Sequence, residues 1–422
     1  MSIMSNLRNA LINNYLRAVR MLYGVKKDKV LFTSFFGKSY SDNPRAVSEA
    51  LHELAPEAEI VWLLNKGDQS HENTPEYIRC VDANNPFQVY KEWATSAVCV
   101  NNFSFLPIPK SKKQKFVQTW HGDKGFKKIL HDSPMVSSDF SVSEQMDGFC
   151  DLMIAGSALG ERVCQSAFRY KGRILMEGTP RNDRLVQNDP DLRRTLKQTL
   201  NIAEDTRLLL YAPTLRRKAS QNKQKQQIQE LDISVTLDLL EKRDNCKWIC
   251  LLRAHPSMVG LCGVGVDSRM MDVSGYEDMA DLLLISDMLI TDYSSCAGDF
   301  ALLRRALVLY QPDRQEYVEN DRTFYFDIDE SPYIVAQNQQ ELESPFSNTG
   351  NSFKTDVFEV EAYCWDTPDH WWNFKYKNFE AAWYKHLSRG FEYRMVDGSE
   401  ITLEFLENMI SECFEAIQKY YR

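Results

Sequence analysis

The chain has 422 residues, of which 43% are hydrophobic and 26% charged, and its net charge is −9. This composition is typical of a folded chain of two or three domains, and it excludes an intrinsically disordered one. The acidic balance argues against general nucleic-acid binding, and the sequence shows neither a run of about 18 apolar residues that could span a membrane nor a secretory signal.

The first predicted element is a basic amphipathic helix within residues 1–27. This segment has no acidic residue, and its apolar residues recur at helical spacing. Such a helix either packs its apolar face on the protein body or lies on an anionic membrane surface, and the sequence leaves both readings open. Its basic residues are Arg8, Arg17, Arg20, Lys26 and Lys27, and its apolar stripe is Leu7, Leu11, Tyr15, Val19 and Leu22.

Short apolar runs then alternate with helix-length amphipathic segments, a pattern typical of βαβ units with parallel strands. One series lies in residues 28–186 and a second in residues 187–344, which predicts an α/β, GT-B-like fold: two Rossmann-like domains facing a central cleft. Strands are predicted at residues 30–36, 60–64, 97–100, 116–120, 152–155 and 173–176, and again at 207–211, 248–252, 288–291 and 306–310.

Two segments have an unusual composition. Residues 216–229 are basic and rich in Gln, which indicates either a solvated loop or a flap near an anionic ligand. Residues 365–384 are crowded with aromatic side chains, which either pack a helix onto the body or form a stacking platform for a substrate. Residues 345–422 are therefore predicted to be a helical, aromatic-rich C-terminal extension.

Polar clusters follow several predicted strands, where open α/β sheets bind their ligands. His121 has a side chain suited to take a proton from a hydroxyl, and Arg253 with His255 offers a cationic pair for phosphates. Ser294 and Ser295 precede a helix-like run, where hydroxyl and N–H groups can bind an anion. The remaining candidates in these clusters are Thr179, Arg181, Thr214, Arg216, Thr291 and Asp292, with Trp120 and Gly122 beside His121.

The 10 cysteines are scattered and form no CxxC pair, which favours free thiols in a reducing compartment and argues against a zinc site. The sequence also lacks an obvious Asp-x-Asp pair or other metal cage. We therefore expect no essential metal and no cofactor.

The joint order of these motifs resembles that of the CDP-glycerol glycerophosphotransferases, the family of teichoic-acid primases and polymerases. The resemblance runs from about residue 30 to about residue 317 and is strongest over residues 276–317. It implies a GT-B fold, a CDP-glycerol or CDP-ribitol donor bound mainly by the C-terminal half, and an acceptor bound mainly by the N-terminal half. It also implies that His121 is the general base and that His255 lies at the donor phosphates, together with Thr214, Arg216, Ser294 and Ser295.

The sequence departs from the family pattern directly after Trp120-His121-Gly122. The family usually continues with Thr-Pro, whereas this chain has Asp123, Lys124 and Gly125 before the downstream pair Lys127-Lys128. Asp123 is predicted to orient His121, to contact the acceptor, or to be an exposed carboxylate paired with Lys124.

These observations predict an enzyme that transfers glycerol phosphate, or a related polyol phosphate, from CDP-glycerol to an acceptor hydroxyl and releases CMP. The acceptor is expected to be a lipid-linked or polymeric surface glycan. The protein is expected in the cytoplasm, where the inner face of the cell membrane is a further candidate partner. The alternatives are a GT-B glycosyltransferase that uses a nucleotide sugar and a catalytically inactive polymer-binding protein.

Overall fold

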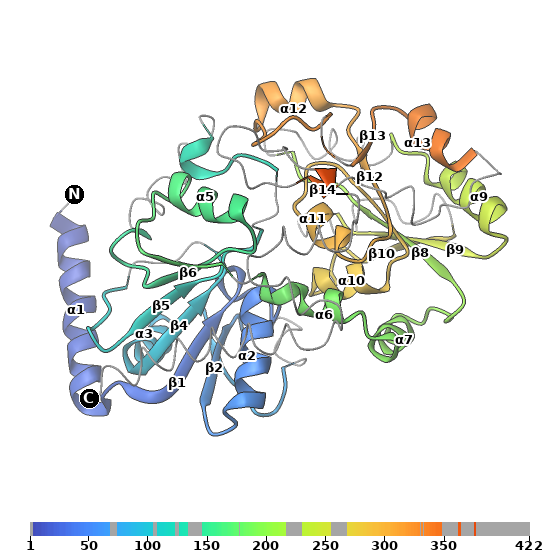
Figure 1. Cartoon of the computed structure of the whole chain (residues 1–422). Helices are drawn as coiled ribbons and strands as arrows, with labels where there is room; N and C mark the ends of the chain where they lie inside the picture. The colour runs from blue at the N-terminus through green and yellow to red at the C-terminus, as the bar shows by residue number, and fades with distance from the viewer. Residues whose placement is uncertain are drawn as a thin grey trace.

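The computed structural model describes residues 3–67, 74–103, 108–122, 126–133, 146–176, 178–216, 230–254, 268–329, 331, 333–347, 362–363 and 375–376. Two parallel sheets dominate it, one in each half of the chain, and they lie side by side in two lobes (Figure 1). This confirms the α/β class with two sheet-centred halves.

The N-terminal half is built on a seven-stranded parallel sheet in the order β3-β2-β1-β4-β5-β6-β7. Both of its faces are covered, because Leu31 of β1 lies in one core cluster while Val30 and Phe32 lie in another. The strands are β1 (Lys26–Thr33), β2 (Glu59–Leu64), β3 (Arg79–Asp82), β4 (Ser96–Asn101), β5 (Lys115–Gln118), β6 (Leu152–Ile154) and β7 (Arg173–Leu175).

The C-terminal half repeats this plan with six parallel strands in the order β10-β9-β8-β11-β12-β13. The strands are β8 (Arg207–Ala212), β9 (Trp248–Leu252), β10 (Met270–Asp272), β11 (Met288–Thr291), β12 (Ala306–Tyr310) and β13 (Ile334–Ala336). The edge strands β3, β10 and β13 were absent from the sequence prediction.

Several helices begin at side chains that accept a hydrogen bond from the first turn. Asn85 accepts from the Gln88 N–H at 3.2 Å, and Asp232 accepts from the Val235 N–H at 3.0 Å. The helices are α1 (Ile3–Tyr23), α2 (Asp42–Leu54), α3 (Pro86–Thr95), α5 (Ala158–Ser166), α6 (Asp183–Gln187), α7 (Pro190–Thr199), α9 (Ile233–Asp244), α10 (Met279–Ile285), α11 (Cys296–Ala301), α12 (Arg314–Asn320) and α13 (Gln339–Ser347), with short 3-10 turns η1 (Phe35–Gly37), η3 (Leu130–Asp132) and η5 (Pro180–Asn182).

Helix α1 lies along the edge of the N-terminal half (Figure 1) and divides its side chains between the body and solvent. Leu16 and Val19 are buried, and the ring of Tyr15 meets that of Phe87 on α3 edge-on at 5.8 Å. Met21 and Leu22 remain 83% and 76% exposed. The helix is therefore docked on the body while its last turn stays apolar and open.

No helix in the part of the chain that the structure describes is both long enough and apolar enough to cross a membrane. In the C-terminal extension, the structure describes the two short antiparallel strands β14 (Ala362–Tyr363) and β15 (Lys375–Tyr376). The predicted terminal helix, most of the aromatic run and residues 217–229 lie outside the described residues.

Candidate active site

The candidate site lies where loops after β4 and β5 meet loops after β8 and β11. Gly122, which follows β5, approaches Ser295, which follows β11, so closely that a Cβ atom on Gly122 would lie 2.7 Å from Ser295 Oγ. The two motifs are 173 residues apart in the chain (295 minus 122) and come from different halves. The carboxyl edges of the two sheets therefore contribute to one site.

His121 is oriented by the loop that follows β4. Its Nδ1 atom lies 2.7 Å from the main-chain oxygen of Asn102. Because a carbonyl oxygen only accepts hydrogen bonds, Nδ1 carries the proton, and in the neutral ring Nε2 keeps a free lone pair. This is the tautomer that a general base requires.

Aromatic rings surround the imidazole of His121. The rings of Trp120, Phe103 and Phe35 lie with their centroids 4.2, 4.9 and 5.5 Å from it. Burial lowers the pKa of His121 to about 4, and nearby positive charges, among them Arg181, lower it further, against the opposing hydrogen bond with Asn102. The ring is therefore neutral at physiological pH and can accept a proton.

The loops around His121 hold non-glycine residues in the left-handed region. Trp120 has a φ of +52°, and the neighbouring loop after β1 contains Phe35 at +46° and Phe36 at +60°. The Trp120 conformation is held at both ends: its N–H donates to Gln118 Oε1 at 2.9 Å, and its carbonyl accepts from Asn43 Nδ2 at 2.9 Å. Such strained backbone is concentrated at functional sites.

On the opposite side, Asp292 organises the loops after β8 and β11. Its carboxylate accepts hydrogen bonds from the Thr214 N–H at 2.9 Å and from Arg216 Nη1 at 2.8 Å. Arg216 also donates two hydrogen bonds to the Asp313 carboxylate, from Nε and Nη2. Its Cζ atom lies 4.7 Å from the ring centroid of Tyr293 and 5.0 Å from that of Tyr317. Although burial disfavours the charged guanidinium, the two carboxylates raise the pKa of Arg216.

Three predicted donor-binding groups remain available to a ligand. Thr214 Oγ1 is buried, and no group in the described ranges hydrogen-bonds to it. Arg253 donates to the carbonyls of Val273 and Tyr276, and within the described residues no carboxylate lies at ion-pair distance from it. Ser295 begins α11 without a side-chain cap bond and faces Gly122. A partly buried guanidinium that has no carboxylate partner among the described residues is suited to bind an anion.

Other predicted donor-binding residues hold the scaffold. Thr291 is buried, and its hydroxyl donates to the Ala212 carbonyl at 2.6 Å. Arg181 bridges the two halves, because it donates to Asp42 at 3.0 Å and to Asp299 at 2.7 Å. Thr179 is buried directly before η5, and Ser294 Oγ accepts weakly from the Cys296 N–H at 3.4 Å.

Two predicted site residues, His255 and Asp123, lie outside the described residues. Residues that the sequence reasoning missed include Asn102, which orients His121, and Asn43, which holds the Trp120 carbonyl. Asn102 directly follows a buried strand, and that position was the signal that could have found it. Among the described residues no group of His, Cys, Asp and Glu is arranged to hold a metal ion.

Comparison with known proteins identifies the group of proteins that this chain resembles. The sequence profile of the family described as CDP-Glycerol:Poly(glycerophosphate) glycerophosphotransferase matches residues 14–360. The teichoic acid glycerol-phosphate transferase of Staphylococcus aureus is 31% identical over 334 residues, which cover 75% of this chain and 82% of that protein.

The teichoic acid poly(glycerol phosphate) polymerase of Bacillus subtilis is 30% identical over 354 residues. These cover 80% of this chain but only 46% of that protein, so this chain spans about half the length of that relative. A solved structure of the wall teichoic acid polymerase TagF superimposes with a TM-score of 0.72 at 24% identity and covers 97% of both chains. That likeness supports the GT-B-like fold.

Proposed function

Because this chain belongs to the CDP-glycerol:poly(glycerophosphate) glycerophosphotransferase family, we propose that it transfers glycerol phosphate, or a related polyol phosphate, from a CDP-activated donor to an acceptor hydroxyl in the synthesis of a teichoic-acid or capsule-type polymer. The observation that supports the proposal is the meeting, across the two halves, of an oriented histidine with the loop after β11 that we propose binds the donor phosphates. A general base and a phosphate site must face each other in such a reaction.

The proposed reaction is a single displacement at phosphorus. His121 Nε2 takes the proton from the acceptor hydroxyl, and the oxygen forms a bond to the β-phosphorus of the donor. The bond from that phosphorus to the bridging oxygen breaks, and CMP leaves with the electron pair. His255 is proposed to lie at the donor phosphates, as the family resemblance implies.

The remaining predicted residues divide into two proposed roles. Arg253, Ser294, Ser295 and Thr214 contact the donor phosphates, since transfer of a phosphoryl group depends mainly on positioning and on stabilisation of negative charge. Arg216, Asp292, Thr291, Thr179 and Arg181 position those groups, because their side chains or backbone are engaged within the protein.

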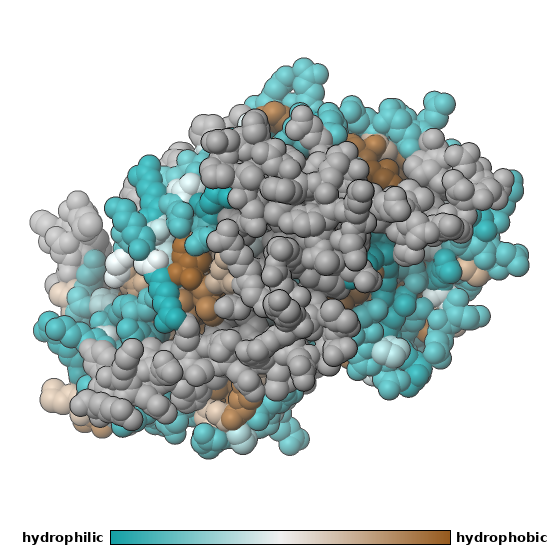
Figure 2. Space-filling view, in the orientation of Figure 1, coloured by the Kyte–Doolittle hydropathy of each residue, from teal (hydrophilic) through white to brown (hydrophobic). Residues whose placement is uncertain are grey.

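We further propose that the reaction takes place in the cytoplasm at the inner face of the membrane, on a lipid-linked or polymeric glycan. The open last turn of α1 supports this placement: Met21, Leu22 and Tyr23 are exposed there, next to Arg17. In Figure 2, tan apolar atoms mark the lower left edge of the molecule, where Figure 1 shows that end of α1. Apolar side chains beside basic ones are typical of contact with anionic lipid.

Product analysis tests the proposed function. The chain is incubated with CDP-glycerol or CDP-ribitol and candidate glycan acceptors, and the release of CMP is measured. The masses of the products are determined by mass spectrometry. Addition of one glycerol phosphate or ribitol phosphate mass per CMP released supports the proposal. Transfer of a sugar from a nucleotide sugar, with no turnover of either CDP-polyol, would contradict it and favour the glycosyltransferase alternative.

A further inference from the structure

Residues 126–128 form a connection between the halves that the sequence motifs did not assign to the site. This segment follows the His121 loop but pairs with residues 323–325, which belong to the C-terminal half. The Lys128 N–H donates to the Thr323 carbonyl at 2.9 Å, the Tyr325 N–H donates to the Phe126 carbonyl at 2.8 Å, and Lys127 forms an antiparallel bridge with Phe324. The backbone of Lys127 is therefore fixed on both sides.

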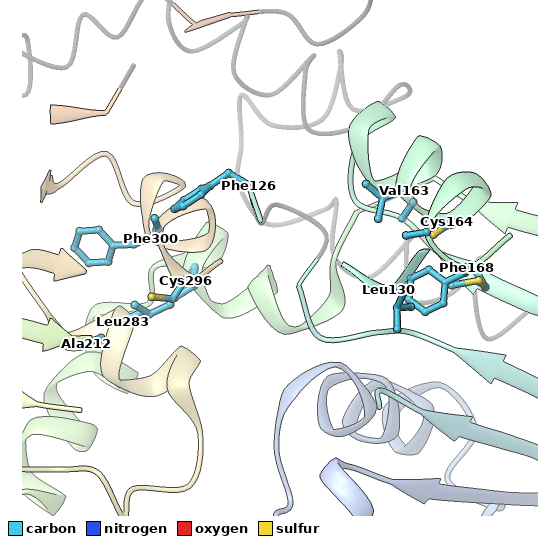
Figure 3. Packing of buried hydrophobic residues seen from close by; sticks show 14 of the residues in the cluster. Phe126, Leu130, Val163, Cys164, Phe168, Ala212, Leu283, Cys296 and Phe300 are labelled. Carbon is cyan, nitrogen blue, oxygen red and sulfur yellow. The ribbon is translucent and has the colours of Figure 1, made fainter. Parts of the chain in front are cut away.

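Side chains on either end of this segment anchor it in different halves. Phe126 is fully buried, with its ring 5.9 Å from Phe324 and 6.1 Å from Phe326, and Figure 3 shows it on the side of Phe300. Leu130 is buried beside Phe168 of the N-terminal half (Figure 3). Lys127 thus lies on a short span whose two ends are both buried in the same hydrophobic core cluster.

The side chain of Lys127 is partly buried and has no partner among the described residues. In the described portion of the chain, no carboxylate lies at ion-pair distance from its ammonium group and no acceptor receives a hydrogen bond from it. Asp292, the carboxylate that most strongly raises its pKa, already accepts from Thr214 and Arg216. Even a partly buried cation is stabilised by an opposite charge, so this arrangement is suited to a ligand that supplies an anion.

Lys127 is tied by the backbone to both sides of the site: it follows His121 in the same loop, and its bridge partner Phe324 stacks on Tyr293, next to Asp292, at 5.8 Å. Its charge acts on His121, on the acceptor side, and the charges of Asp292 and Arg216, on the donor side, act on it. In an in-line displacement the transferred phosphorus must lie between the attacking oxygen at His121 and the leaving CMP. The Lys127 backbone is therefore held near the region through which the phosphoryl group would pass.

We propose that Lys127 is a catalytic residue that holds the non-bridging oxygens of the phosphoryl group during its transfer. This deepens the proposed function and rests on it. As the acceptor oxygen bonds to phosphorus and the bond to CMP breaks, the lysine neutralises charge on the equatorial oxygens and exchanges no proton. Lys127 belongs to the N-terminal half and is held in place by pairing with residues 323–325 of the C-terminal half. It can therefore hold the transferred phosphoryl group only when the two halves are in contact.

Titration of Lys127 gives the proposal a second readout. Burial lowers the pKa of Lys127 to about 8, an effect that Asp292 and Asp321 oppose and that Arg322 and Arg216 reinforce. The ammonium form exists below this pKa and is lost as the pH rises through it. The value of kcat/KM, which reports the free enzyme, should therefore fall above about pH 8.

The test compares Lys127→Met and Lys127→Arg with Lys128→Met in the full chain. Lys128 is a matched control, because adjacent residues of a paired strand point to opposite sides. We expect Lys127→Met to lose about 10²–10³-fold in kcat for CMP release, as when one charge-stabilising donor is removed. Lys128→Met should stay within twofold of the wild type, and all variants should keep the wild-type melting temperature. Lys127→Arg should recover at least tenfold over Lys127→Met and show no fall near pH 8.

Calorimetric binding of CDP separates this inference from the proposed function. We expect Lys127→Met to bind CDP about tenfold more weakly than the wild type at pH 7, with the difference vanishing above about pH 9. If Lys127→Met keeps a third or more of the wild-type kcat and binds CDP equally well, the role of Lys127 is wrong while the proposed function stands. If the wild type binds CDP through Lys127 but releases no CMP from either CDP-polyol, the proposed function is wrong instead.

Discussion

At the scale of single residues, the contact between His121 Nδ1 and the Asn102 carbonyl determines which ring nitrogen is free to act as a base. Burial among aromatic rings keeps that nitrogen unprotonated near neutral pH. A base with so low a pKa is weak in the free enzyme. Bound phosphate would raise it, because a nearby negative charge favours the imidazolium form.

We expect His121→Ala to lower the rate of CMP release by about 10²–10⁴-fold and to leave CDP binding nearly unchanged, because the base acts on the acceptor. In the wild type, kcat/KM should fall on the acid side only near pH 4, since protonation of His121 at about that pH removes the base. Steady-state kinetics across pH measure both effects.

His52→Ala is the matched control, because His52 stacks on Tyr77 at 3.6 Å, within the N-terminal half and away from Asn102. It should keep the wild-type rate within twofold. An acid limb near the ordinary histidine pKa of about 6.5 would contradict the buried environment of His121.

The contact of Gly122 with Ser295 supports a second prediction at this scale. In Gly122→Ala the new Cβ would lie 2.7 Å from Ser295 Oγ and 3.1 Å from its Cβ, so the Ser295 side chain must rotate away and its Cβ must shift by a few tenths of an ångström. Because small displacements in an active site can cost up to about 10²-fold, we expect kcat/KM to fall at least tenfold.

Gly275→Ala provides the comparison for this change, since a Cβ on Gly275 would meet no atom within 4 Å. Wild-type activity in Gly122→Ala would show that the two loops do not meet in solution as they do in this structure.

At the scale of elements, helix α1 packs one face on the protein body and leaves its last turn exposed to solvent. Leu16 and Val19 pack on the body, so deletion of residues 1–27 would expose the core as well as remove the basic segment. Point changes in the exposed last turn therefore test membrane contact more cleanly than truncation does.

We expect the double variant Met21→Ser, Leu22→Ser to bind vesicles of anionic phospholipid at least tenfold more weakly, since burying two such side chains is worth about 2 kcal/mol or more. Co-sedimentation at low and high salt measures the binding, and turnover on a soluble acceptor should be unchanged.

Leu54→Ser on α2 is the control, because Leu54 is also partly exposed, at 37%, but lies on a different helix. Equal vesicle binding by the double variant and the wild type would show that the open turn of α1 has another role.

At the scale of the whole molecule, buried ion pairs join the two halves. Arg181 links Asp42 to Asp299, and Arg45 of α2 lies 3.3 Å from Asp278 before α10. These contacts position the donor loops against the acceptor loops without touching the reacting groups.

We expect Arg181→Met to lower the free energy of unfolding by about 3–5 kcal/mol, because it leaves two buried carboxylates without their cation. Arg194→Met should change it by less than about 1 kcal/mol, since the Arg194–Asp191 pair is largely exposed, with side-chain exposures of 46% and 74%. Urea denaturation of both variants measures the difference, and equal values would contradict a stabilising role for the Arg181 bridge.

The sequence by itself determined the two parallel sheets and the strand-end positions of His121 and Ser295. Apolar runs such as Leu208–Leu210 specify buried strands locally, and polar residues that follow such runs must emerge at a sheet edge. The predicted strands at residues 248–252, 288–291 and 306–310 agree with β9, β11 and β12.

Only the tertiary structure decided which polar residues face the ligand site and which hold the scaffold. Arg181 and Arg253 look alike in sequence, yet Arg181 meets carboxylates 139 and 118 residues away, while Arg253 meets only carbonyls among the described residues. Likewise, the partner that orients His121 is a backbone oxygen, and the position of Lys127 depends on a bridge to Phe324. Residue type is local, whereas the partner of a charge depends on which distant loops the packed core brings together.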